Sequence, residues 1–171
     1  MLLGGTRPTR DIDFGVGGAG ERRWPEIEAA ILAAADESRV AVQYSTDIDR
    51  WSPVAIPPGR FKTRRLRRIG RLSVHLLDPG CWAVYKLARY LDADVDDLCS
   101  VLRRERLSPM MLARLCGESL QASPRSTQLF AFRRHVEHFF ETYGERVWGK
   151  RFSAERAAAI FHRTAKIVPR R

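Results

Sequence analysis

The spacing of the hydrophobic residues changes at Asp78-Pro79, and this change constrains the fold more than any other feature of the sequence. Before it, short segments such as 72–77 alternate apolar and mixed residues, which is typical of strands. After it, the segments begin with residues that cap helices. The sequence therefore predicts an α+β protein with its strands in roughly the first 77 residues and helices in the rest.

Caps, prolines and turns predict the order of the elements. A strand near Asp11 leads through a Gly-rich segment to a helix over 25–38, and a short strand follows at 40–44. An arginine-rich strand turns at Gly70 into the strand over 72–77. Helices are expected over 79–90, 94–106 with Asp94 as the N-cap, 109–120, 126–143 and 153–167. We expect a mixed sheet with flanking helices in a domain over 1–106, with a helical region, 107–171, packed on it.

The composition indicates which partners and which cellular compartment to expect for this chain. A net charge of +10 attracts polyanions, of which nucleic acid is the commonest inside a cell. No run of about 18 apolar residues and no secretory signal is evident, so we expect a cytoplasmic protein without a membrane partner. The three cysteines, Cys81, Cys99 and Cys116, are expected to be reduced thiols in the core.

Basic residues concentrate on the predicted strand before Gly70. This segment is the best candidate for contact with phosphate groups. An equally weighted alternative is a solvated basic edge that prevents aggregation of the sheet. The residues concerned are Arg60, Lys62, Arg64, Arg65, Arg67, Arg68 and Arg71.

Two carboxylates, Asp11 and Asp13, lie one residue apart in an apolar frame. Side chains at i and i+2 of a strand project to the same face, so both carboxylates are expected to converge while Ile12 and Phe14 face a core. Such a pair can hold a divalent metal ion, and burial of both without a cation would be costly. The alternative is that they cap a turn or pair with nearby arginines.

The ordered set of motifs resembles minimal bacterial nucleotidyltransferases of the DNA polymerase beta superfamily, including toxins of toxin-antitoxin pairs. The resemblance covers roughly residues 6–115. It rests on Arg-Pro-Thr-Arg-Asp-Ile-Asp-Phe at 7–14, Val-His-Leu-Leu-Asp-Pro at 74–79, Lys-Leu-Ala-Arg at 86–89 and Asp-Val-Asp-Asp-Leu at 94–98.

The resemblance implies metal-dependent transfer of a nucleoside monophosphate from a nucleoside triphosphate to a hydroxyl group. It implies that Asp11 and Asp13 bind Mg²⁺ or Mn²⁺, and that Lys86, assisted by Arg89, contacts the triphosphate. Asp94 and Asp97 would orient Lys86 or support the metal site. Gly4, Gly5 and Thr6 would correspond to a shortened phosphate-binding turn. Asp94 as a helix cap and Lys86 as a partly buried surface lysine are the structural alternatives.

The chain also departs from the family pattern. Only five residues separate Gly5 from Asp11, whereas the family places its phosphate-binding turn about ten residues before the carboxylates. The later central strand offers Ser73 and His75 where many relatives carry a third carboxylate. Asp47 and Asp49, in the preceding loop, are possible replacements.

Three further motifs have competing interpretations. Gly15-x-Gly17-x-x-Gly20 fits a dinucleotide-binding fingerprint, but no acidic residue lies about twenty positions later at the end of a second strand, which favours a loop beside the metal site. His135, His138 and Glu141 have metal-binding spacing, yet a solvated helix face is favoured. An aromatic stripe is expected to pack the C-terminal helices onto the rest of the protein; it comprises Phe130, Phe132, Phe139, Phe140 and Tyr143.

The sequence thus predicts a nucleotidyltransferase acting on an RNA acceptor, such as a transfer RNA, or on a protein, with an antitoxin protein as a further possible partner. The alternative is a catalytically inactive relative that binds nucleic acid or a partner protein through the arginine-rich hairpin.

Overall fold

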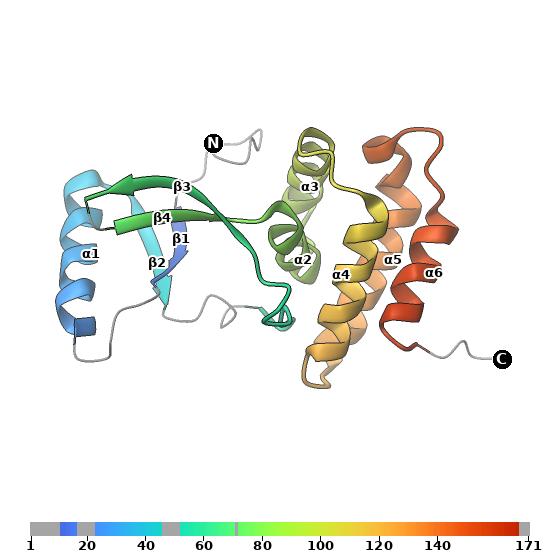
Figure 1. Cartoon of the computed structure of the whole chain (residues 1–171), viewed down its shortest axis with the longest axis horizontal. Helices are drawn as coiled ribbons and strands as arrows, with labels where there is room; N and C mark the ends of the chain where they lie inside the picture. The colour runs from blue at the N-terminus through green and yellow to red at the C-terminus, as the bar shows by residue number, and fades with distance from the viewer. Residues whose placement is uncertain (1–10, 17–22, 46–51, 71, 168–171) are drawn as a thin grey trace. The chain divides into compact units, whose positions relative to one another are not determined.

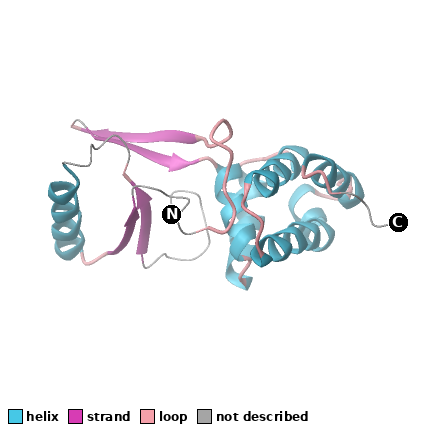
Figure 2. Ribbon diagram, turned by 90° about the horizontal axis from the view of Figure 1, so that it is seen from below, coloured by secondary structure: helices cyan, strands magenta, loops and turns pink. Residues whose placement is uncertain are grey.

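The computed structural model describes residues 11–16, 23–45, 52–70 and 72–167, and leaves the side chains of residues 11–13 and 45 undescribed (Figures 1 and 2). These residues fall into two compact units, one on each side of residue 51, and we describe each by itself. Each unit contains both helix and strand, and helix predominates, which confirms the α+β class. The predicted domain boundary after residue 106 falls within the second unit.

The first unit is a strand-helix-strand segment. Strand β1 (Asp11–Gly15) and strand β2 (Ala41–Ser45) pair in parallel, with Asp13 opposite Gln43, and helix α1 (Trp24–Ser38) makes the crossover that a parallel pair requires. The Phe14 and Tyr44 rings stack with centroids 6.0 Å apart, and the Tyr44 hydroxyl donates a hydrogen bond to Glu28 at 2.8 Å. The predicted helix and second strand are confirmed to within about one residue.

The second unit begins with a loop and an antiparallel hairpin of strand β3 (Thr63–Ile69) and strand β4 (Leu72–Leu77). Gly70 has a φ of 57° in the turn. The pairing shifts register between Arg65 and Arg67, where a bulge interrupts the ladder. Within the described residues the strands form two separate two-stranded sheets, one parallel and one antiparallel.

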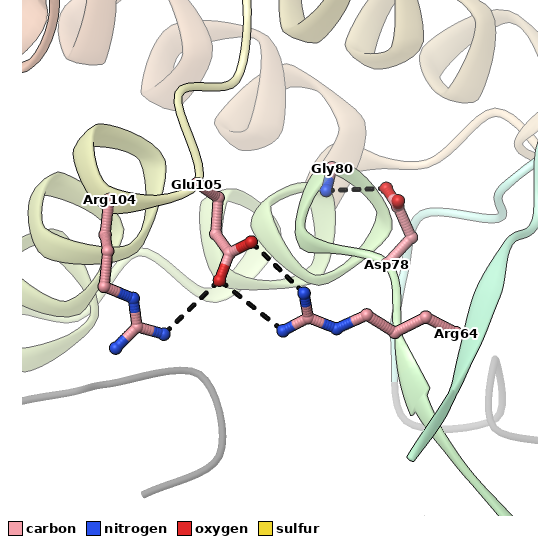
Figure 3. Close-up of polar contacts among 5 residues, drawn as sticks. All are labelled: Arg64, Asp78, Gly80, Arg104 and Glu105. Atoms are coloured by element: carbon pink, nitrogen blue, oxygen red, sulfur yellow. Dashed lines mark hydrogen bonds and ion pairs between the residues drawn. The ribbon is translucent and has the colours of Figure 1, made fainter.

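Five helices follow the hairpin. They are α2 (Pro79–Arg89), α3 (Asp92–Arg104), α4 (Pro109–Ala122), α5 (Thr127–Trp148) and α6 (Ala154–Thr164). The Asp78 carboxylate starts α2 by accepting the Gly80 N–H at 2.9 Å (Figure 3), and Ser153 starts α6 by accepting the Arg156 N–H at 3.1 Å. Helix α5 continues five residues beyond the predicted end at Tyr143. Its Gly144 leaves room for the Phe152 ring, with which a Cβ atom there would clash.

The core of the second unit is shared by all five helices and by Val54 and Ile56 of the preceding loop. Its largest fully buried side chains include Phe132, Phe139, Phe140 and Phe161. The predicted aromatic stripe was wrong at Phe130, which is 70% exposed. The other stripe residues pack among the helices, and the three cysteines are buried in the core as predicted and form no disulfide with one another. No helix in the described part of the chain is long and apolar enough to cross a membrane.

Candidate functional site

Three charged side chains meet where α2 ends and α3 begins. Lys86 Nζ lies 2.7 Å from Asp94 Oδ1. Arg89 contacts both carboxylate oxygens, with Nη2 2.7 Å from Oδ1 and Nε 2.8 Å from Oδ2. The residues Lys86 and Arg89 are three apart in the last turn of α2 and so lie on one face. The structure therefore brings together three of the predicted site residues.

The local backbone explains why these groups meet. Helix α2 ends at Arg89, and its C-cap Tyr90 has a left-handed φ of 54° and donates its N–H to the Lys86 carbonyl at 2.8 Å. Helix α3 starts directly after Leu91, so that the two helices turn within two residues. The prediction that Asp94 is the N-cap was wrong, because Asp94 is the third residue of α3, where its Oδ2 accepts the Leu91 N–H at 3.3 Å. The charges also suit the helix dipoles, since Lys86 and Arg89 lie at the C-terminal end of α2 and Asp94 lies at the N-terminal end of α3.

Burial and charge both act on Asp94, whose side chain is 1% exposed. Burial alone raises the pKa of Asp94, but hydrogen bonds from Arg89 and Lys86 outweigh it and lower the pKa to about 2. The carboxylate is therefore ionised at neutral pH. The Lys86 side chain is 20% exposed, and its Nζ also lies 5.5 Å from the centroid of the Trp82 ring. The single Asp94 carboxylate thus contacts two cations, Lys86 and Arg89.

Tyr90 joins this cluster to α5, which the sequence did not predict. Its ring stacks on His135 with centroids 4.7 Å apart, and its hydroxyl lies 2.8 Å from His138 Nδ1. The His135 Nδ1 lies 3.0 Å from the Leu87 carbonyl oxygen. Burial, the largest cause, raises the pKa of Tyr90. The favoured interpretation of these histidines as a solvated face was therefore wrong for His135, which packs against α2.

The other predicted site residues are only partly described. Asp11 and Asp13 lie in β1, opposite Ala41 and Gln43, while their side chains are outside the description, as are Gly4, Gly5 and Thr6 altogether. Asp97 is partly buried on α3, one turn after Asp94. Among the residues whose side chains are described, no group of three or more His, Cys, Asp or Glu side chains has metal-binding geometry.

Two of the predicted phosphate-binding arginines are held by carboxylates of the helices. Arg60 Nε lies 2.6 Å from Glu118 Oε2, and Arg64 Nη1 lies 3.2 Å from Glu105 Oε2. Figure 3 shows Glu105 between Arg64 and Arg104. These pairs join residues 58 and 41 positions apart, so no local signal in the sequence indicates them.

The remaining basic residues of the segment are exposed. Lys62, Arg65 and Arg67 make no ion pair with any described residue, and Arg68 Nε donates to the Gly70 carbonyl at 3.0 Å. Arg71 lies outside the described residues. Among the described arginines of this segment, those that make no ion pair with a described carboxylate, Arg65, Arg67 and Arg68, thus lie on β3 itself.

No protein-family model matches the chain, and neither a curated protein nor a solved structure matches it.

Proposed function

We propose that the protein is a metal-dependent nucleotidyltransferase that moves a nucleoside monophosphate from a nucleoside triphosphate to a hydroxyl group on RNA. The arrangement of Lys86 and Asp94 carries the proposal. The buried Asp94 carboxylate fixes Lys86, whose ammonium group can contact a phosphate oxygen of an anionic substrate. A triphosphate is the anion that the motif order of this chain suggests.

Lys86 and Arg89 have different parts in this proposal. Lys86 contacts the triphosphate oxygens as a cation, while Asp94 acts as a positioning residue that keeps its side chain in one place. Arg89, whose side chain is 58% exposed, shares the Asp94 carboxylate with Lys86 and helps to hold that carboxylate in place. Loss of Lys86 should therefore weaken nucleotide binding more than loss of a surface lysine does.

The donor set of Asp11 and Asp13 fits Mg²⁺ or Mn²⁺, because carboxylate oxygens are the preferred ligands of hard divalent cations. Two carboxylates with phosphate oxygens form a usual ligand set for such an ion. When bound, the cation neutralises charge on the transferred phosphoryl group.

The proposal is tested by measuring transfer of a labelled nucleotide to RNA. The full chain is incubated with Mg²⁺, each labelled nucleoside triphosphate in turn, and total RNA. An RNA acceptor should be labelled, and Asp13→Asn and Lys86→Gln should abolish the labelling. The matched controls are Asp96→Asn and Lys150→Gln, which alter exposed residues and should retain activity. Absence of both labelling and Mg²⁺-dependent nucleotide binding would overturn the proposal.

A second candidate function is nucleic-acid binding without catalysis. The exposed Arg65, Arg67 and Arg68 favour it, because phosphate contacts need cations that no carboxylate already neutralises. Salt-dependent RNA binding without any labelling would select this candidate over the enzyme.

A further inference from the structure

The hairpin of β3 and β4 has two chemically different faces. Directly opposite residues of a ladder share a face, and successive residues alternate. Arg68 is opposite Ser73 and Arg65 is opposite His75, so these four share a face. Thr63 belongs to it as well, since its Oγ1 lies 3.2 Å from His75 Nδ1. We call these five exposed residues the polar face: Thr63, Arg65, Arg68, Ser73 and His75.

The bulge separates the arginines. In an uninterrupted strand Arg65 and Arg67 would share a face, but the register shift between them places Arg67 opposite Val74, on the other face. That second face is largely apolar and includes the pair Ile69 and Leu72, which are 57% and 61% exposed. Arg64 also lies there, where Glu105 holds it.

We propose that the polar face is the surface that docks on the phosphate backbone of nucleic acid. It presents two guanidinium groups, two hydroxyls and an imidazole. All of these groups can donate hydrogen bonds to the oxygens of phosphate and sugar. His75 and Ser73 are two residues apart on β4, so their partners Arg65 and Arg68 are spaced by about 7 Å along the ribbon. Both arginines can therefore reach neighbouring phosphate groups.

The composition of the polar face favours nucleic acid over an acidic protein. The centres of protein interfaces are rich in aromatic and apolar side chains. The polar face has none among its five residues, and Leu77 at its base packs against the helical core. A two-stranded ribbon also has the width to enter the major groove of B-form DNA.

The inference rests on the proposed nucleic-acid partner, and its test measures binding rather than catalysis. Affinities of the full chain for double-helical RNA, double-helical DNA of the same sequence and single-stranded RNA are measured over a series of salt concentrations. Arg65→Ala and Arg68→Ala should each weaken binding and reduce the salt slope by about 1. Arg67→Ala is the matched control, because it removes the same charge from the same strand but on the opposite face. It should have a smaller effect on the affinity and on the salt slope.

The three nucleic acids and the variants distinguish the possible outcomes. Preference for RNA or for DNA identifies which nucleic acid the polar face takes. Equal losses in Arg67→Ala and Arg65→Ala would overturn the inference, as would equally tight binding of polyglutamate that depends on Arg65. Asp13→Asn should lose labelling but bind RNA like the wild type. Absence of labelling by the wild type itself, with intact face-dependent binding, contradicts only the proposed enzyme. Labelling that persists with face-independent binding contradicts only this inference.

Discussion

Lys86 Nζ lies 2.7 Å from Oδ1 of Asp94, and the two side chains are 20% and 1% exposed. A carboxylate this deeply buried stays charged only because cations surround it, and Arg89 supplies the second one. The pair therefore links the end of α2 to the beginning of α3 while keeping a cationic group at the surface. Its effect on stability can be measured separately from any catalytic role.

Asp94→Asn should destabilise the second unit by about 1–3 kcal/mol, because the amide keeps the shape but leaves Lys86 and Arg89 without their counter-charge. Urea unfolding of both proteins measures the difference. Asp96→Asn is the matched control two residues away, at a position 66% exposed, and should change stability by less than about 0.5 kcal/mol. Equal effects of the two variants would mean that the buried cluster does not stabilise the helix junction.

The contribution of Asp94 should depend on pH in a defined direction. Hydrogen bonds from Arg89 and Lys86 outweigh the effect of burial and lower the pKa of Asp94 from 3.8 to about 2. A folded pKa below the unfolded one gives stability that is present above about pH 4 and is lost as pH falls to about 2. The stability gap between wild type and Asp94→Asn should therefore close over this window. A gap that is constant down to pH 2 would contradict the ion pair.

Helix starts were predictable, whereas partners across the fold were not. Asp78-Pro79 and Ser108-Pro109 act on the residues next to them, so each was placed from the sequence alone. The start of α3 was misplaced because a carboxylate suits both the N-cap and the third helical position. Which one Asp94 takes depends on contacts with the preceding helix.

The two incorrect side-chain predictions on α5 have a similar origin. Phe130 and Phe132 are two residues apart, so they cannot face the same side of a helix, and only Phe132 is buried. The predicted stripe included both because it counted aromatic residues rather than their angular positions. His135 was taken as solvated because its partners, Leu87 and Tyr90, are more than forty residues earlier.

The pair of Arg64 and Glu105 should hold the hairpin to the helical part of its unit. Glu105→Gln removes the charge that holds Arg64, as Figure 3 shows, and should cost at most about 1 kcal/mol because the pair is partly exposed. Amide hydrogen exchange of β3 and β4 should become faster while that of α5 is unchanged. Glu155→Gln, at an exposed position of α6, serves as the control and should leave the hairpin amides unaffected.

Gly117→Ala should destabilise the protein even though alanine favours helices. The two helices α4 and α6 approach closely at Gly117, where a Cβ atom would lie 2.9 Å from the Phe161 carbonyl oxygen and 2.7 Å from Thr164 Cβ. Because a backbone oxygen cannot rotate away, α6 must shift, at a cost of about 1–3 kcal/mol that exceeds the propensity gain of up to about 1 kcal/mol. Gly59→Ala, where a Cβ atom meets nothing within 4 Å, is the matched control. Thermal unfolding should place Gly117→Ala below the wild type and Gly59→Ala close to it; an unchanged Tm for Gly117→Ala would show that α4 and α6 are less tightly packed than the structure indicates.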